Sequence, residues 1–508
     1  LSSSSGKDYS NLKDINQEIF FKEDPTKINY IHVENVFDDY NKQILLPHKL
    51  SQFGPAIAVS DVNGDNLEDV YIGSASGKSS QLFLQTMEGN FTLSKNQPWA
   101  VHRVLEDVDA IFFDSDSDGD DDLYVVSGGN EFAPNSSTYL DRLYINDGNG
   151  LFEFKRELLP SMYKSGSVVK PNDFDNDGDL DLFIGSRMIP WNYPEAASSY
   201  LLLNHNGKFS LYNDVNNSFK DLGLVTDSVW SDYDRDGDED LFVVGEWMPL
   251  TLIKNEKGVL KKQKLNNECD EVYGWWYSIE AGDFNNDGLE DLVMGNLGEN
   301  YKYKASKEEP FEVFYDDFDD NGVKDIVLAY YNYGIQFPLR GFSCSSQQVP
   351  ELKNKFKEYD LFASLDVKSA YGDANLENAL RLQANSFKSR VLLNTNGNFS
   401  NIDLPYEAQF SSINDFVIED YNGDGLKDIL AIGNLFTSEI ETPRNDASNG
   451  ILLIGKGDGS FYTKLRKESG FYAPSDAKKI IPLKIKNENG ILVGNNNDLL
   501  QYFKAIKP

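Results

Sequence analysis

Short apolar runs alternate with polar turns along most of the chain, and most runs are only about four to eight residues long. Val, Ile, Tyr and Phe are frequent within the runs, a composition that suits a pleated, half-buried surface. Asn-Gly and Asp-Gly pairs separate many neighbouring runs, and these pairs favour tight β-hairpin turns. The pattern therefore predicts an all-β fold built from antiparallel hairpins.

One stretch breaks this pattern, at about 349–385. Leu352, Phe356 and Tyr359, and then Leu376 and Leu380, recur there at helical spacings. No run approaches eighteen consecutive apolar residues, so the sequence predicts no membrane-spanning helix.

A nine-residue acidic pattern, D-x-[DN]-x-[DN]-[GN]-x-x-D, recurs seven times. Internal repetition of this kind is the strongest single guide to a repeat architecture, and the first five copies begin about 50–60 residues apart. The copies occupy residues 61–69, 114–122, 173–181, 232–240, 283–291, 317–325 and 420–428.

The spacing within each copy suits one hard cation. Oxygen atoms at positions 1, 3, 5 and 9 and the carbonyl of position 7 can surround Ca²⁺, and a Gly or Asn at position 6 permits the sharp turn. An EF-hand would add a Glu at position 12 and flanking helices, which these copies lack. We therefore predict about seven calcium sites, with ligands Asp61, Asn63, Asp65, Leu67 and Asp69; Asp114, Asp116, Asp118, Asp120 and Asp122; Asp173, Asp175, Asp177, Asp179 and Asp181; Asp232, Asp234, Asp236, Asp238 and Asp240; Asp283, Asn285, Asp287, Leu289 and Asp291; Asp317, Asp319, Asn321, Val323 and Asp325; and Asp420, Asn422, Asp424, Leu426 and Asp428.

Each acidic loop lies between two apolar runs, A and B, and a second hairpin, C and D, usually follows. Four-stranded antiparallel units repeated in this way are typical of β-propeller blades. The loops at 283 and 317 are too close for two blades, so residues 300–388 are interpreted as a partly helical insert between strands B and C of blade five. The run at 28–37 is expected to complete the last blade.

This count predicts a seven-bladed β-propeller over residues 26–508, preceded by a tether or linker at 1–25. Counting the loop at 317–325 as its own blade would give eight blades. The chain begins at Leu1 rather than Met, which indicates a processed product or a fragment.

The acidic loops and the Gly-containing runs after them resemble the FG-GAP/VCBS repeats of integrin α-subunit propellers and their bacterial relatives. Residues 30–503 resemble the C-terminal propeller half of long, surface-exposed VCBS-repeat proteins of the Bacteroidetes. The phrases that carry this likeness are VVSGGNEF (125–132), VVGEWMP (243–249), GWWYSI (274–279), GNLGENYKYKAS (295–306) and VGNNNDLLQYF (493–503). The resemblance implies a calcium-binding propeller that is secreted or held at the bacterial cell surface, associated with the outer membrane. It also implies an accessory subunit of an outer-membrane complex. The ASPIC/UnbV segment found in many such proteins is not evident here.

Composition narrows the function further. A hydrophobic content of 40% supports a full core, and a net charge of −35 makes nucleic acid an unfavourable partner. The two cysteines, Cys269 and Cys344, form no zinc or redox motif, and whether they form a disulfide stays open.

The long B–C connections are expected on the rim opposite the acidic loops, where loops on a rigid scaffold commonly bind partners. Aromatic and Arg residues there suit a protein or glycan interface. The predicted contact residues are Trp191, Tyr193, Trp247, Tyr301, Tyr303, Arg340 and Arg444, whereas Trp230, Trp275 and Trp276 are expected in the core.

No nucleophile, base and orienting group can be assembled from the sequence, so no catalytic residue is predicted. The leading hypothesis is a non-enzymatic, extracellular binding module stabilised by calcium. The alternative is a calcium-dependent polysaccharide lyase on a propeller scaffold, and a third possibility is a spacer within a larger assembly.

Overall fold

The computed structural model describes residues 19–265 and 268–506, and the strands in this range pair antiparallel. The all-β prediction is confirmed. The first four sheets are β2 (Ile57–Ser60), β3 (Asp69–Ile72), β4 (Gln81–Gln85) and β5 (Phe91–Leu93); β6 (Asp107–Phe113), β7 (Asp122–Ser127), β8 (Arg142–Asn146) and β9 (Phe152–Phe154); β10 (Ser165–Asn172), β11 (Asp181–Met188), β12 (Tyr200–His205) and β13 (Lys208–Leu211); and β14 (Leu224–Ser231), β15 (Asp240–Pro249), β16 (Thr251–Glu256) and β17 (Val259–Gln263).

Three further sheets follow along the chain, and the pairing of β15 with β18 joins the first of them to the sheet before it. They are β18 (Tyr273–Gly282), β19 (Asp291–Asn296), β24 (Arg390–Thr395) and β25 (Asn398–Asp403); β26 (Asp415–Glu419), β27 (Asp428–Ile432), β28 (Ile451–Gly455) and β29 (Phe461–Lys464); and β30 (Ala477–Pro482), β31 (Gly490–Asn495), β32 (Gln501–Ala505) and β1 (Phe21–Glu23). Short 3₁₀ turns lie at Asp39–Asn41, Pro98–Val101, Ser137–Tyr139, Arg156–Leu158, Glu268–Glu271 and Tyr406–Gln409, and α6 covers Arg466–Ser469.

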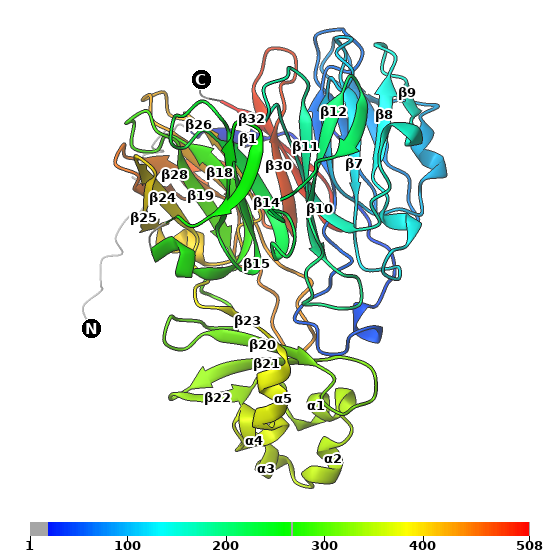
Figure 1. The fold of residues 1–508 in the computed structure, drawn as a ribbon. Helices are drawn as coiled ribbons and strands as arrows, with labels where there is room; N and C mark the ends of the chain where they lie inside the picture. The colour runs from blue at the N-terminus through cyan, green and yellow to red at the C-terminus, as the bar shows by residue number, and fades with distance from the viewer. Residues whose placement is uncertain (1–18, 266–267, 507–508) are drawn as a thin grey trace, which may run out of the picture.

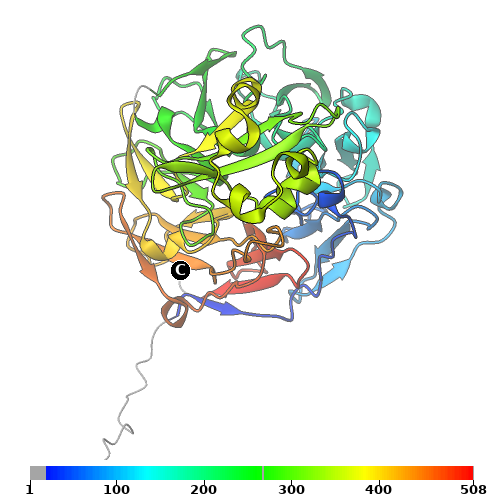
Figure 2. The ribbon, with the colours of Figure 1, turned by 90° about the horizontal axis from the view of Figure 1, so that it is seen from below.

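The first strands of these sheets contact one another in a closed ring. Contacts run in the order β2, β6, β10, β14, β18, β26 and β30, and β30 returns to β2. Seen from below, the colours follow the chain around the disc until red meets blue (Figure 2). Sheets arranged radially around a ring of innermost strands are the blades of a β-propeller.

An N-terminal strand completes the last sheet. Phe21 of β1 pairs with Ala505 of β32, and its ring lies against Phe471 at a centroid distance of 5.6 Å. The prediction that 28–37 supplies this strand is wrong, because β1 pairs along β32 and the run at 28–37 adds only an isolated bridge between Ile31 and Leu499. The predicted tether or linker at 1–25 is therefore also wrong for residues 21–23, which form β1. Residues 1–18 lie outside the described residues.

Residues 300–388 leave the propeller between β19 and β24, which pair directly with each other. They form a separate sheet with helices on one face, seen below the propeller in Figure 1. We call this element the insert. It contains β20 (Phe311–Asp316), β21 (Asp325–Asn332), β22 (Ile335–Pro338) and β23 (Leu380–Ala384), with α1 (Phe342–Gln348), α2 (Leu352–Lys355), α3 (Tyr359–Ala363), α4 (Val367–Tyr371) and α5 (Asp373–Asn378).

The helical prediction for the insert holds only in part. Helices begin earlier than predicted, at Phe342, and Leu380 begins strand β23 rather than ending a helix. The reason is tertiary, because β23 pairs along β20 and completes one edge of the insert sheet. Among the described residues, no helix is both long and apolar enough to cross a membrane.

The insert packs on the rim of the propeller that carries the second-to-third-strand connections. Phe311 and Val313 of β20 share one buried apolar cluster with Tyr193, Trp247 and other residues of the rim. Ion pairs border this cluster, with Arg340 Nη1 2.5 Å from Glu439 Oε1 and Lys324 Nζ 2.5 Å from Glu195 Oε1. The insert therefore covers part of the face on which partner binding was predicted.

Candidate metal-binding loops

Six of the seven acidic loops join the first strand of a sheet to the second, and the seventh joins β20 to β21 in the insert. Because the strands are antiparallel, the six propeller loops all lie on one rim, opposite the insert. The sequence thus places six copies of one chemical motif in equivalent structural positions.

The carboxylate at position 1 organises the turn. Asp173 Oδ1 accepts a hydrogen bond from the backbone N–H of Asp177 at 3.0 Å, and its Oδ2 accepts one from Gly178 at 3.0 Å. The sixth residue adopts positive φ in every copy, which explains why Gly or Asn stands there. The same pair of hydrogen bonds is formed by Asp61, Asp114, Asp283, Asp317 and Asp420.

The carboxylate at position 9 anchors each propeller loop to the third strand. Asp122 Oδ1, for example, accepts a hydrogen bond from the backbone N–H of Asn146 at 2.8 Å. Equivalent bonds join Gln85 to Asp69, Asn204 to Asp181, Asn255 to Asp240, Asn394 to Asp291 and Gly455 to Asp428.

Burial raises the pKa of all seven position-9 carboxyl groups, and neighbouring carboxylates add to the effect in most loops. The pKa is raised to about 7 for Asp69, Asp181, Asp240 and Asp325, and to about 6 for Asp122, Asp291 and Asp428. A positive charge close to such a carboxyl group favours its ionised form and lowers its pKa.

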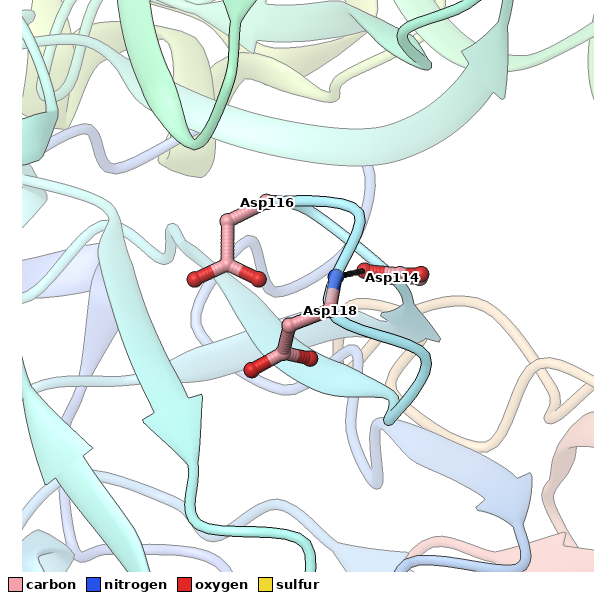
Figure 3. A group of neighbouring side chains, drawn as sticks. All are labelled: Asp114, Asp116 and Asp118. Atoms are coloured by element: carbon pink, nitrogen blue, oxygen red, sulfur yellow. Dashed lines mark hydrogen bonds between the residues drawn. The ribbon is translucent and has the colours of Figure 1, made fainter.

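In four loops, three carboxylate oxygens lie within 4.8 Å of one another. Figure 3 shows one of them, in which Asp116 and Asp118 project to the same side of the loop. The groups are Asp114, Asp116 and Asp118; Asp173, Asp175 and Asp177; Asp232, Asp234 and Asp236; and Asp317, Asp319 and Asp325. In the other three loops Asn63, Asn285 and Asn422 occupy position 3.

Unpartnered buried oxygens mark these loops as suited to a hard cation. Asp116 Oδ1, Asp181 Oδ2 and Asp319 Oδ1 are buried without a hydrogen-bond donor. Buried oxygens normally have a partner, and Ca²⁺ takes six to eight oxygen ligands in flexible geometry. The donor set therefore fits calcium. The ligand role of the position-7 carbonyls stays a prediction.

On the opposite rim, the prediction that Tyr193, Trp247 and Arg340 contact a partner is wrong, because all three are buried. Tyr193 donates its hydroxyl hydrogen to Glu246 Oε2 at 3.0 Å and accepts one from Trp247 Nε1 at 2.6 Å. Tyr301 and Tyr303 are buried in the same apolar cluster. These residues hold the insert in place.

The other two predicted contact residues differ. Trp191 is half-buried, donates from Nε1 to the Asn130 carbonyl at 2.9 Å and lies under the Lys42 ammonium at 3.8 Å. Arg444 is exposed, with its guanidinium 4.7 Å from the Phe436 ring centroid. Trp275 and Trp276 are fully buried, as the sequence predicts, and Trp230 is partly buried.

The structure also brings together charged groups that the sequence did not single out. A cavity of about 110 Å³ is lined by residues of the innermost strands β6, β10, β14, β18, β26 and β30. Ion pairs cross between blades there, with Lys170 3.3 Å from Asp227 and Lys479 3.6 Å from Asp109. No sequence motif predicts these ion pairs, because each residue comes from a different repeat.

The free thiol of Cys344 shows that the two cysteines are not joined as a disulfide.

The ring of sheets and the acidic first loops define an antiparallel β-propeller with a repeated loop motif on one rim. Residues 61–125, 114–184 and 232–294 each match the family model of the FG-GAP-like repeat. The chain thus carries FG-GAP-like repeats in three stretches of its β-propeller. No curated protein matches it.

Solved structures similar to this chain include the Vibrio cholerae biofilm matrix protein Bap1, at 10% identity and a TM-score of 0.36, covering 96% of this chain and 92% of that one. Saccharomyces cerevisiae Sqt1 is similar at 10% identity and a TM-score of 0.43, covering 90% and 96%. YCF48 from Cyanidioschyzon merolae is similar at 9% identity and a TM-score of 0.42, covering 91% and 97%.

Proposed function

We propose that this chain is a non-enzymatic, seven-bladed propeller that calcium stabilises and that binds a protein or glycan partner outside the cell. We further propose that it serves as an accessory subunit at a bacterial cell surface. The observation that carries the calcium proposal is the repeated loop geometry, in which several carboxylates converge and leave buried oxygens without donors.

Calcium is the cation that this chemistry favours. All of the donors are oxygens, and the Asp and Asn side chains at positions 1, 3, 5 and 9 would hold the ion against the position-7 carbonyl. Modest-affinity sites of this type fill at the millimolar calcium concentrations found outside cells. An extracellular location follows from the same reasoning.

The outer side of the insert is the favoured partner surface, because the loop face beneath it is covered. Tyr333, at the tip of the β21–β22 hairpin, is 96% exposed, and Tyr359 of α3 is 64% exposed. Ile335 and Leu361 are exposed beside these two in the chain. Exposed aromatic residues on a rigid element commonly anchor protein or glycan partners.

Metal analysis of the purified chain tests the calcium proposal. Elemental analysis after equilibration with calcium is expected to find several calcium ions per chain, and chelation is expected to lower the Tm. Asp173→Ala should remove one ion, and at a free calcium concentration one hundred times the Kd the lost site is worth about 2.7 kcal/mol of stability. Asp446→Ala, which changes an exposed aspartate outside the loops, is the control.

Fewer than four calcium ions per chain, or zinc in their place, would contradict the proposal. A third outcome would favour the alternative hypothesis, a calcium-dependent polysaccharide lyase. In that case Asp173→Ala would leave the Tm unchanged and would abolish an activity on acidic polysaccharide.

A further inference from the structure

One position in the third strand distinguishes the loop at 232–240 from the other propeller loops. In each blade with an acidic loop, one third-strand residue donates its backbone N–H to the position-9 carboxylate. The side chain at the distinguishing position belongs to the residue directly before that donor. That side chain is aliphatic in five blades, as Leu84, Ile145, Leu203, Leu393 and Ile454, and in the fourth blade it is Lys254.

The Lys254 ammonium lies among the carboxylates of its own loop. Its Nζ donates to Asp234 Oδ2 at 2.7 Å, to Asp236 Oδ2 at 2.7 Å and to Asp240 Oδ2 at 3.1 Å. These are positions 3, 5 and 9, the side chains predicted to bind a cation. An ammonium has three N–H donors, so all three are used on these oxygens.

The turn itself differs from the other copies. Asp232 Oδ2 accepts the Gly237 N–H at 3.2 Å, as at the same position elsewhere. Its Oδ1, however, is buried without a hydrogen-bond partner, whereas Oδ1 of the other six position-1 carboxylates accepts the N–H of position 5. Asp232, Asp234 and Asp236 still bring one carboxylate oxygen each within 4.8 Å of one another, so the Lys254 ammonium competes with a cation for Asp234 and Asp236.

The charges respond as expected for a tight ion cluster. Burial acts to lower the pKa of Lys254, but its three carboxylate partners raise it well above the usual value. Burial acts to raise the pKa of Asp236, but the hydrogen bond from Lys254 lowers it. The Lys254 side chain is 9% exposed and Asp240 is fully buried, so water screens this pair least, whereas Asp234 and Asp236 are 29% and 42% exposed.

We propose that the loop at 232–240 is neutralised by Lys254 and takes no calcium, while the loops with an aliphatic side chain at this position bind the ion. This inference rests on the proposed function. A divalent cation at this loop would have to displace the ammonium from three carboxylates and would then lie close to its positive charge. The fourth blade thus carries a built-in cation in place of an exchangeable one.

Lys254→Leu, which installs the side chain of Leu203 and Leu393, tests the inference. The variant is expected to bind one more calcium ion per chain than the wild type, measured by elemental analysis and by isothermal titration calorimetry. Leu393→Lys should do the reverse in the loop at 283–291 and remove one ion. Lys261→Leu, which removes an exposed lysine of the neighbouring strand β17, should leave the number unchanged.

Equal calcium numbers in a calcium-binding wild type and in Lys254→Leu would overturn the inference and leave the proposed function standing. If neither protein binds calcium, the calcium proposal fails, and the inference fails with it. A wild-type crystal structure grown with calcium gives a check that needs no variant. Anomalous density for calcium within the 232–240 loop would overturn the inference, and density in the 173–181 loop without it would support the inference.

Discussion

At the residue scale, the buried Glu34 and Glu106 and the half-buried Glu131 form an acidic cluster on the propeller, where the segment after β1 meets the second blade. Glu106 is 1% exposed and Glu34 is 7% exposed, and each has a buried carboxylate oxygen without a hydrogen-bond partner. Burial, with the charges of Glu34 and Glu131, raises the pKa of Glu106 well above its usual value. Burial also raises the pKa of Glu131 to about 8, and Asp39 adds to the effect.

This cluster predicts that stability falls as the pH rises from about 4.5 to about 8. Because the pKa of Glu131 is raised in the folded chain, its contribution is complete below about pH 4.5 and is lost as the pH rises through about 8. Between pH 6 and 9 the wild type should lose roughly 1–3 kcal/mol more stability than Glu131→Gln, measured by denaturant unfolding at fixed free calcium. Glu88→Gln, at an exposed turn, should follow the wild type. Parallel curves for the wild type and Glu131→Gln would show that Glu131 is already ionised at pH 6.

At the element scale, the insert is held by a buried ion pair as well as by its apolar cluster. Arg340 is 4% exposed, and its Nη1 lies 2.5 Å from Glu439 Oε1. Burial opposes ionisation of Glu439, but the hydrogen bond from Thr442 and the positive charge of Arg340 lower its pKa. Glu439 is therefore a carboxylate that depends on its partner.

Arg340→Leu is expected to loosen the insert, because it leaves Glu439 with only the partly exposed Lys302 ammonium, 3.9 Å away, as a countercharge. The cost is expected to stay below the about 3–5 kcal/mol of a buried charge that has lost its only partner. Limited proteolysis and hydrogen exchange should show faster cleavage and exchange near residues 300–310, with the propeller sheets unchanged. Arg444→Leu removes an exposed arginine on the same rim and should behave like the wild type. Unchanged protection at 300–310 in Arg340→Leu would mean that the apolar cluster alone holds the insert.

At the scale of the whole molecule, β1 and β32 close the ring by pairing the N-terminal part of the chain with the C-terminal part. Phe21 is fully buried, with ring contacts to Tyr421 at 5.2 Å and Phe471 at 5.6 Å. Its ring thus lies in the apolar cluster between the last two blades.

Phe21→Ala should destabilise the propeller by about 3–5 kcal/mol, because it removes a fully buried aromatic ring. Thermal unfolding should show this loss both with calcium and with chelator, whereas the effect of Asp173→Ala should disappear in chelator. The pair of variants separates closure of the ring from stabilisation by calcium. A Phe21→Ala effect seen only in calcium would contradict this division.

Much of this architecture can be predicted from local pattern. Alternating apolar runs, hairpin turns and seven acidic copies determine the strands, the antiparallel units and the loops, because each depends on residues close together in the chain. The same pattern places the interruption near residue 300, since the loops at 283 and 317 leave no room for a blade between them. The hydrogen bond from the Gly178 N–H to Asp173 is an example of such locally determined structure, because both residues lie within one turn.

Only the tertiary structure decided which groups meet across longer separations. Tyr193 and Trp247 look like exposed loop aromatics in the sequence, but they are buried by segments distant in the chain. Gln43 and His48 contact Tyr193, and Phe311 of the insert stacks on Trp247. Lys254 reads as an ordinary strand lysine until strand pairing places its ammonium among Asp234, Asp236 and Asp240. Local sequence sets backbone geometry and turn chemistry, whereas burial and the pairing of charges depend on distant segments that the folded ring brings into contact.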